Sequence, residues 1–355
     1  MFLKRPIIGL VVIVLFVSNN PAWCGQAEQV DSLRSEWIKA RENFQHELGI
    51  AATSQERELL KAKNPDREFA SRFLRLAEKL GTNSEAAAEV LVYTTYADRN
   101  GSVGDQALNL LARDHVDSRC LELLFNSKPL PDDAAAENLF RAIAGRSRKY
   151  EYQGQATKIL ADLLKDSDPD EAGKLYQVVI KNYGDVKSFE DFGQRLGKQA
   201  QRGLFYVDHL VTNKIAPDFE GKDTSGKIIK LSDYRGKIVL VYFCSISCAP
   251  CHALYPYWRS LTERMKDQPF ILIGINSDPP QKMFEIIQKE KITWPTLLDD
   301  YNQPNSINAQ WYVQGWPTIF LIDEKGVIRR HWVGSPGDEI IDQQVQELLK
   351  KASGD

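Results

Sequence analysis

The sequence has few cysteines and almost no excess of either charge. Five cysteines among 355 residues are too few for a disulfide-stapled scaffold. A formal net charge of -3 provides no broad positive field for nucleic acid, so we expect no nucleic-acid partner. Hydrophobic residues make up 43% and charged residues 26%, which excludes a collagen-like or wholly disordered chain. The length exceeds what one hydrophobic core usually supports and therefore predicts about two domains.

The longest apolar run lies at the amino terminus. Two basic residues precede an apolar run over 7–17, and a polar segment follows it. This order is typical of a signal peptide, so we expect an exported protein in the periplasm or another extracytoplasmic compartment. We assign residues 1–27 to the signal peptide, with cleavage after Ala27. Cleavage after Cys24 and an uncleaved membrane anchor are the alternatives.

Residues 28–212 are predicted to form an all-α domain, because apolar residues recur in them at helical spacing. The clearest helix has Phe69 and Phe73 on one face and Gly81 at the expected carboxyl-terminal cap. Together with it we predict about eight or nine short helices in an irregular array. The others cover 84–98, 105–113, 118–125, 132–144, 153–165, 170–183 and 189–211.

The helical domain is interpreted as a spacer or a purely structural domain, and the alternative is a docking surface for a protein partner. One segment, 168–183, has the pattern of a tetratricopeptide-type helix, but no regular period extends across the domain. Cys120 lies beside several leucines and is predicted to be a buried apolar thiol.

Residues 213–355 are predicted to form an α/β domain. Short β-rich runs alternate with helical stretches, which predicts a central mixed sheet flanked by helices on both faces. The strands are predicted over 228–231, 238–243, 270–275, 318–322 and 327–332, and the last two form an antiparallel hairpin. A final helix is predicted over 338–351, with the inward positions Ile340, Ile341, Val345, Leu348 and Leu349.

Three of the five cysteines lie close together at the end of a predicted strand. The strand is followed by Cys248-Ala249-Pro250-Cys251 and then by a helical stretch. A cysteine at a helix amino terminus is near unpaired amides and the positive end of the helix dipole, which favour the reactive thiolate. The two-residue spacer lets Cys251 attack a mixed disulfide on Cys248 and release the partner. We therefore predict Cys248 as the attacking thiolate and Cys251 as the resolving thiol, with no metal and no cofactor beyond their own redox-active disulfide.

Several separated motifs agree with one family. They are Ala216-Pro217-Asp218-Phe219, Leu231-Ser232-Asp233-Tyr234-Arg235-Gly236-Lys237, the strand into the cysteine pair, and Gly315-Trp316-Pro317-Thr318. In these motifs the region from about 215 to 352 resembles the thioredoxin superfamily, in particular the exported TlpA/ResA-like thiol-disulfide oxidoreductases with a redoxin-type start. The resemblance implies a thioredoxin-like fold, protein dithiol or disulfide substrates and a membrane-borne electron donor. It does not extend to the helical half.

The resemblance also implies a cis peptide bond before Pro317, at a position that faces the cysteine pair. Trp316 and Pro317, together with Ala249 and Pro250, are then expected to line the substrate groove. The alternative for Pro317 is an ordinary trans proline at a strand edge.

Three departures from the family pattern concern proton transfer and the turn before the pair. Cys244-Ser245-Ile246-Ser247 stands where the family has Trp-x-x-Trp. Tyr242 and Leu254 replace the two acids that usually relay a proton, and a phenol is a poor base near neutral pH. Water or His252 is the candidate for proton transfer from the resolving thiol. A solvated helix residue is the alternative for His252.

Cys244 is the extra thiol of the cluster. We interpret it as a small buried filler, since a buried free cysteine is usually inert. A disulfide from Cys244 to Cys248 or to Cys120 is the alternative.

Other functions also fit parts of the sequence. Cys248-Ala249-Pro250-Cys251-His252 matches the c-type haem attachment pattern, but such a site needs neither the preceding strand nor the downstream Trp-Pro-Thr motif. A peroxidase would need a proline where this chain has Val241, although Ser245 fits. A third alternative is a redox-inactive binding or adaptor protein with a helical docking domain. Among these we predict a thiol-disulfide oxidoreductase that acts as a reductase of exported protein disulfides.

Overall fold

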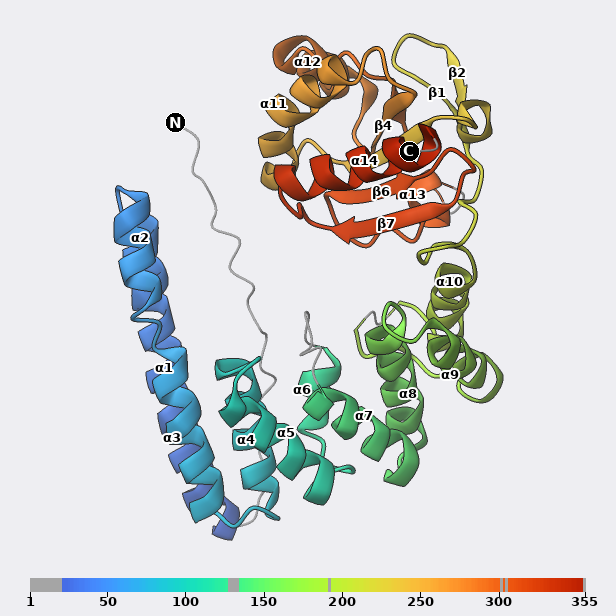
Figure 1. The fold of residues 1–355 in the computed structure, drawn as a ribbon. Helices are drawn as coiled ribbons and strands as arrows, with labels where there is room; N and C mark the ends of the chain where they lie inside the picture. The colour runs from blue at the N-terminus through green and yellow to red at the C-terminus, as the bar shows by residue number, and fades with distance from the viewer. Residues whose placement is uncertain (1–20, 127–133, 191–192, 301–302, 304–305, 354–355) are drawn as a thin grey trace. The chain divides into compact units, whose positions relative to one another are not determined.

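The computed structural model describes residues 21–126, 134–190, 193–300, 303 and 306–353 (Figure 1). The chain divides into two compact units, Met1–Gln153 and Gly154–Asp355. Of the predicted signal peptide, residues 1–20 lie outside the described part, and the remainder begins helix α1 (Pro21–Ile50). Within the described residues, no helix combines the length and the apolar character that crossing a bilayer requires.

The first unit is helical throughout its described part, as predicted. After α1 it contains α2 (Ser54–Lys61), α3 (Asp66–Lys79), α4 (Glu85–Ala97), α5 (Ser102–Asp114), α6 (Leu121–Phe125) and α7 (Ala134–Arg146), and α8 (Tyr150–Leu164) begins in it. Two of the starts have side-chain caps: Thr53 and Glu56 form a capping box, and Ser84 accepts from the Ala87 N–H. Gly81 ends α3 with a φ of 81°, which confirms the predicted cap.

Aromatic side chains form the core at the start of the first unit. Trp37 of α1 packs edge-on against Phe73 of α3 at 5.4 Å between ring centroids, and Tyr93 of α4 lies 5.8 Å from the same phenyl ring. The prediction contains neither α1 nor α2. The 30 residues of α1 carry no single apolar stripe, since only Val30 and Trp37 are buried along the part from Val30 to Ile50.

The second unit contains the central sheet, in the order β5-β4-β3-β6-β7. β3 pairs in parallel with β4, and β4 with β5, whereas β6 runs antiparallel to β3 and to β7. The bounds are β3 (Ile238–Cys244), β4 (Phe270–Asn276), β5 (Thr296–Leu298), β6 (Thr318–Ile322) and β7 (Ile328–Val333). The predicted mixed sheet and its closing hairpin are confirmed. A separate pair, β1 (Glu220–Lys222) and β2 (Ile228–Lys230), is antiparallel.

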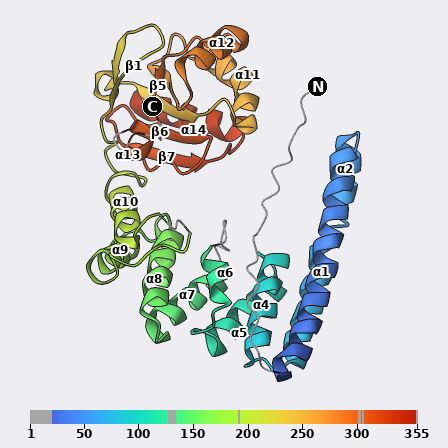
Figure 2. The same cartoon turned by 180° about the vertical axis from the view of Figure 1, so that it is seen from behind.

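Each face of the sheet is covered. Alternate residues of β3, among them Leu240 and Tyr242, pack with α11 (Ala249–Arg264) and α14 (Asp338–Ser353) in one core cluster. Phe243 points to the other face, where it meets Trp311 and Phe320. Figure 1 shows α14 in red across the strands, and Figure 2 shows the sheet from behind. The second unit also contains α12 (Pro280–Glu290), α13 (Ile307–Gln310) and the 3-10 turn η1 (Leu231–Tyr234).

The inward face of α14 needs one correction. Ile341, Val345 and Leu348 are buried, and Leu349 packs against the same cluster, but Ile340 is 46% exposed. Adjacent helical residues differ by about 100° around the axis, so Ile340 and Ile341 do not share a narrow buried stripe.

Two helices of the predicted all-α region belong to the second unit, α9 (Pro169–Asn182) and α10 (Leu196–His209). The Tyr206 hydroxyl of α10 bonds to Asp166 and lies 3.0 Å from Nδ1 of His331 in β7. The division between the two compact units therefore falls between Gln153 and Gly154. The sequence instead predicts a domain boundary at 212/213, where predicted helices are followed by predicted strands. The boundary at 212/213 stays a prediction.

Helix α10 starts later than predicted. The segment before it closes on itself, because the Ser188 N–H donates to the Gln194 carbonyl and the Leu196 N–H to the Val186 carbonyl. Gly184 and Gly197 approach closely there, since a Cβ on Gly197 would lie 2.8 Å from the Gly184 Cα. The described residues 193–195 are thereby held out of the helix.

Candidate active site

The predicted cysteine pair lies where β3 leads into α11. Cys248 is the N-cap of α11, with an extended backbone at φ -91° and ψ 99°. Its Sγ accepts the Cys251 N–H at 3.2 Å. The same N–H also donates to the Cys248 carbonyl oxygen at 3.0 Å, so Cys248 offers it two acceptors at the helix start. Pro250, in the first turn, removes a donor that no helical carbonyl could have accepted.

Cys248 and Cys251 form a disulfide in this structure, with their Cα atoms 5.3 Å apart. The two sulfur-bearing residues differ in burial. Cys251 is completely buried, whereas Cys248 is half-buried and the neighbouring Ala249 and Pro250 are exposed. Cys248 is therefore the more accessible member of the pair.

The Trp316–Pro317 peptide bond is cis, as the resemblance implied. Pro317 directly precedes β6, whose first residue, Thr318, pairs with Phe243 near the end of β3. This antiparallel register brings Pro317 to the sheet edge from which the cysteine turn departs. Trp316 packs against the same core cluster as Cys248, and its Nε1–H donates to Oδ1 of Asn308 at 3.5 Å. The predicted groove residues thus gather at one edge of the sheet.

Tyr242 and Leu254 occupy the places of the expected acids. The Tyr242 hydroxyl donates to the Cys251 carbonyl oxygen at 3.0 Å. Burial raises the pKa of the Tyr242 phenol far above its ordinary value, so it stays protonated and cannot act as a base near neutral pH. Leu254 is buried in the core.

His252 contacts the turn before the pair. Its Nε2 lies 2.7 Å from the Ile246 carbonyl oxygen, and its ring meets that of Tyr255 edge-on at 5.4 Å. A carbonyl oxygen only accepts hydrogen bonds, so we assign the ring proton to Nε2. In this tautomer Nδ1 has a lone pair that can accept a proton. A proton-transfer role for His252 stays a prediction.

Asp278 is a residue of this site that the sequence analysis missed. It follows β4, whose last residue, Asn276, pairs with Cys244 at the end of β3. Its carboxylate accepts the Ile246 N–H at 2.6 Å and the Asn276 amide at 3.0 Å. The available signal was a polar Asn-Ser-Asp run after a buried strand, because the carboxyl ends of parallel strands share a sheet edge.

Cys120 and Cys244 are free thiols in this structure. Cys244 is buried with Asn276 Nδ2 3.7 Å from its sulfur, and burial raises its thiol pKa to about 12. Cys120 is only half-buried, and its Sγ lies 3.9 Å from a carboxylate oxygen of Glu85. The prediction of an apolar burial site for Cys120 is therefore wrong. Burial, followed by the charge of Glu85, raises the Cys120 pKa to about 12.

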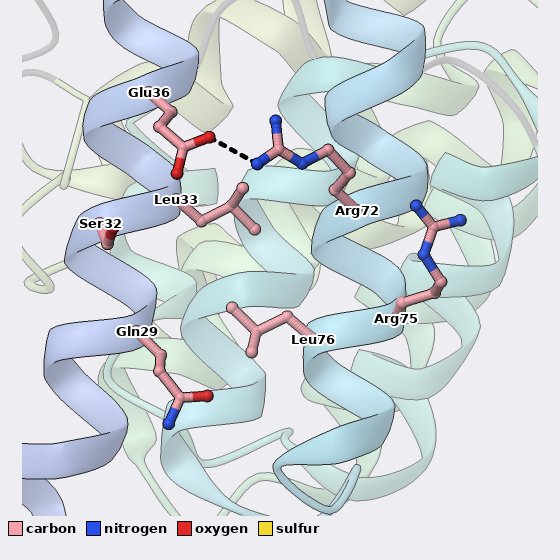
Figure 3. A pocket seen from close by; sticks show the side chains of 7 residues that line it. All are labelled: Gln29, Ser32, Leu33, Glu36, Arg72, Arg75 and Leu76. Atoms are coloured by element: carbon pink, nitrogen blue, oxygen red, sulfur yellow. Dashed lines mark hydrogen bonds and ion pairs between the residues drawn. The ribbon is translucent and has the colours of Figure 1, made fainter.

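Within its described part, the structure has two surface grooves, one in each compact unit. One, of about 430 Å³, runs between α1 and α3, where Leu33 and Leu76 face each other and Arg72 reaches Glu36 (Figure 3). Figure 3 also shows Arg75 pointing away from α1. The other, of about 340 Å³, is lined by α9, α10 and the residues that follow α10. Neither of these two grooves is lined by a residue of the predicted site.

The AhpC/TSA family pattern matches residues 212–331. The thiol-disulfide oxidoreductase ResA of Geobacillus kaustophilus is 32% identical over 140 residues, which are 39% of this chain and 79% of the relative. This chain belongs to the ResA-like thiol-disulfide oxidoreductases. A second relative, the thioredoxin-like protein YneN of Bacillus subtilis, is 31% identical over 134 residues, or 37% of this chain and 76% of that one.

Among solved structures, the thioredoxin domain of a thiol-disulfide oxidoreductase from Bacteroides vulgatus has 26% sequence identity. It covers 39% of this chain and 99% of that chain, with a TM-score of 0.36. The AhpC/TSA match begins at residue 212, after α10, and covers most of the sheet-containing region with the cysteine pair. Family membership makes protein disulfides the enzyme's substrate class.

Proposed function

We propose that this enzyme reduces disulfide bonds of exported proteins, with Cys248 as the attacking thiolate and Cys251 as the resolving thiol. One observation carries the assignment. The half-buried Cys248 caps α11 with its sulfur on an amide, while its partner sulfur is on a fully buried residue. A capping amide and the helix dipole stabilise negative charge on the outer sulfur.

The proposed reaction has two exchange steps. The reduced Cys248 thiolate attacks one sulfur of the substrate disulfide, the substrate S–S bond breaks, and a mixed disulfide forms while the leaving thiolate takes a proton from water. Cys251 then loses its proton and attacks Cys248 Sγ, which releases the second substrate thiolate. Two electrons pass to the substrate, and the pair ends as the disulfide present in this structure. No metal and no cofactor beyond this disulfide enter the scheme.

The proton of Cys251 goes to water or to His252 in this proposal. A histidine that accepts it would change the pH dependence of the second step, because its own protonation state then controls the rate. A His252→Ala variant whose exchange rates between pH 6 and 8 equal those of the wild type would remove His252 from the mechanism.

The proposed compartment is extracytoplasmic, because the basic and apolar segment at the amino terminus is typical of a signal peptide. Thiols are not kept reduced there by cytosolic systems, so a reductase needs a membrane-borne electron donor to regenerate its pair. We further propose that the helical region binds a protein partner, for which its groove between α1 and α3 offers a mixed apolar and charged lining.

The function is tested with insulin as the disulfide substrate and dithiothreitol as the electron source. Wild-type protein and Cys120→Ser should accelerate insulin reduction equally, and Cys251→Ser should accumulate a mixed disulfide on Cys248. A protein that leaves the insulin rate unchanged would favour a redox-inactive adaptor. A Soret band in the purified protein would favour haem attachment through Cys248 and Cys251. A reduction potential well above those of periplasmic isomerases would make the protein an oxidant.

A further inference from the structure

The backbone of Ile246, two residues before Cys248, is hydrogen-bonded through both its N–H and its carbonyl oxygen. Its N–H donates to the Asp278 carboxylate at 2.6 Å. Its carbonyl oxygen lies 2.7 Å from Nε2 of His252, which donates to it. The two contacts come from different elements, since Asp278 follows β4 and His252 lies in the first turns of α11.

Ser245 connects these hydrogen bonds to Cys248. Its hydroxyl lies 3.2 Å from the Asp278 carboxylate and 2.9 Å from the Ser247 hydroxyl. Its carbonyl oxygen accepts the Cys248 N–H at 3.1 Å. Asp278 is itself held in place, because its own N–H donates to Oδ1 of Asn276 and its carboxylate accepts from the Asn276 amide. A continuous set of hydrogen bonds therefore joins the end of β4 to Cys248.

The turn held in this way is also where the chain departs from the family. Cys244-Ser245-Ile246-Ser247 precedes the pair where the family has Trp-x-x-Trp, so Cys244 and Ser247 take the places of the two aromatic side chains. Small hydroxyl side chains bury little apolar surface, so packing alone holds such a turn weakly. A carboxylate that accepts several N–H and O–H donors supplies the missing hold, because charge-assisted hydrogen bonds are stronger than neutral ones.

We infer that Asp278 is a positioning residue for Cys248, and that His252 assists it on the carbonyl side of Ile246. We call the hydrogen bonds that Asp278 and His252 make to the Ile246 backbone the clamp. In the oxidised state the disulfide ties Cys248 to α11. After reduction that covalent tie is gone, and the clamp keeps the Cys248 sulfur at the helix start, facing the Cys251 N–H. This inference rests on the proposed role of Cys248 as the attacking thiolate.

The clamp assigns distinct effects to the shape and to the charge of Asp278. Asp278→Ala removes the acceptor, so the turn loosens and the attack geometry is lost. Asp278→Asn keeps a carbonyl acceptor at the same place but removes a negative charge near the Cys248 turn. Loss of that charge favours the thiolate, and we expect Cys248 to ionise at lower pH in this variant.

The test compares kcat/KM for insulin reduction with the pH midpoint of Cys248 alkylation by iodoacetamide in the full-length protein. Asp278→Ala is expected to lower kcat/KM by roughly 10- to 100-fold, the scale of a displaced catalytic group. Asp278→Asn is expected to stay within about threefold and to shift the alkylation midpoint downward. Asp267→Ala is the matched control, because Asp267 is an exposed carboxylate just before β4, at the opposite end of the strand.

Wild-type kinetics in Asp278→Ala would overturn the inference. So would an Asp278→Asn protein that is folded by circular dichroism yet has lost as much activity as Asp278→Ala. For His252, the clamp predicts that His252→Ala lowers the rate by the same factor at every pH from 6 to 8. A change confined to one end of that range would instead assign it to proton transfer. An inactive wild type would refute the proposed function and not the clamp.

Discussion

Cys120 and Cys248 each stand directly before a helix, one in each compact unit, and their surroundings have opposite effects on a thiolate. Cys248 has the extended backbone of a true N-cap, and its sulfur accepts an amide of α11. Cys120 has helical angles, φ -63° and ψ -20°, and its side chain makes no cap hydrogen bond. The partner found for its sulfur is the Glu85 carboxylate at 3.9 Å.

A position before a helix is therefore insufficient to activate a cysteine. The side chain must turn back onto the free amides, which the extended conformation of Cys248 allows and the helical conformation of Cys120 prevents. The helices also differ, because α11 has 16 residues and α6 has five. With a carboxylate nearby and its thiol partly buried, Cys120 has a raised pKa and remains a thiol at neutral pH.

The contrast is tested most strongly by removing each sulfur. Cys248→Ser should reduce insulin reduction by more than about 1000-fold, because a hydroxyl is a far weaker nucleophile at neutral pH. Cys120→Ser should stay within about twofold of the wild type, since its thiol is protonated and lies in the other unit. Initial rates with dithiothreitol as donor measure both. Equal losses in the two variants would contradict the contrast.

Burial perturbs ionisation in the second unit as well, at His331. Burial lowers the His331 pKa to about 4 from 6.5, so the unfolded chain binds a proton between these values that the folded ring does not. The buried neutral His331 therefore makes the free energy of unfolding depend on pH. This free energy is unaffected above pH 6.5 and decreases by about 3 kcal/mol as the pH falls toward 4.

Hydrogen exchange of the β7 amides at pH 7 and pH 4.5 measures this loss. His331→Gln should reduce the difference in protection between the two pH values. His209→Gln should leave that difference unchanged, because His209 is exposed. Asp166, which bonds to the same tyrosine hydroxyl, does not mimic the effect. Burial opposes its ionisation, but Lys165 and Tyr206 outweigh burial and hold its pKa below 3.8, so its contribution disappears only in stronger acid. An unchanged pH dependence in His331→Gln would show that another group titrates.

The smallest expected effect sharpens the account of Cys120. Glu85→Gln keeps the acceptor for the Ser118 hydroxyl, at 2.7 Å, but removes the charge beside the thiol. The Cys120 pKa should fall by about one unit and remain above its ordinary value, because burial is the larger cause. The pH profile of Cys120 alkylation, read by mass mapping, measures the shift. Glu78→Gln, an exposed carboxylate of α3, is the control, and a shift of the same size there would exclude a local charge effect.

Local patterns in the sequence predict most of the fold. β6 is predicted to the residue over 318–322, because a short apolar run there lies between turn signals. The Cys248 turn is equally readable, since strand, cysteine pair and helix follow each other directly. By contrast, β1 and β5 are missed: each has three residues, and β1 (Glu220–Lys222) contains no apolar residue that would mark it as a strand. α1 is missed because its buried positions form no stripe.

The unpredicted parts of the site depend on residues far apart in the chain. Asp278 reaches Ile246 across 32 positions, and only the parallel pairing of β3 with β4 brings them together. Glu85 reaches Cys120 across 35 positions by helix packing. No single-sequence pattern contains such a contact, because periodicity reports which face of an element is buried and not what lies against it.

The sequence by itself determined the candidate cysteine pair, its expected place at a helix start and the resemblance to ResA-like oxidoreductases, because these depend on neighbouring residues. Tertiary structure alone decided that Cys248 is the accessible member of the pair, that Cys120 lies beside a carboxylate, and that Asp278 and His252 hold the turn. The physical reason is that a thiol's chemistry follows the charges and amides within a few ångströms of it, and folding brings those groups from distant parts of the chain.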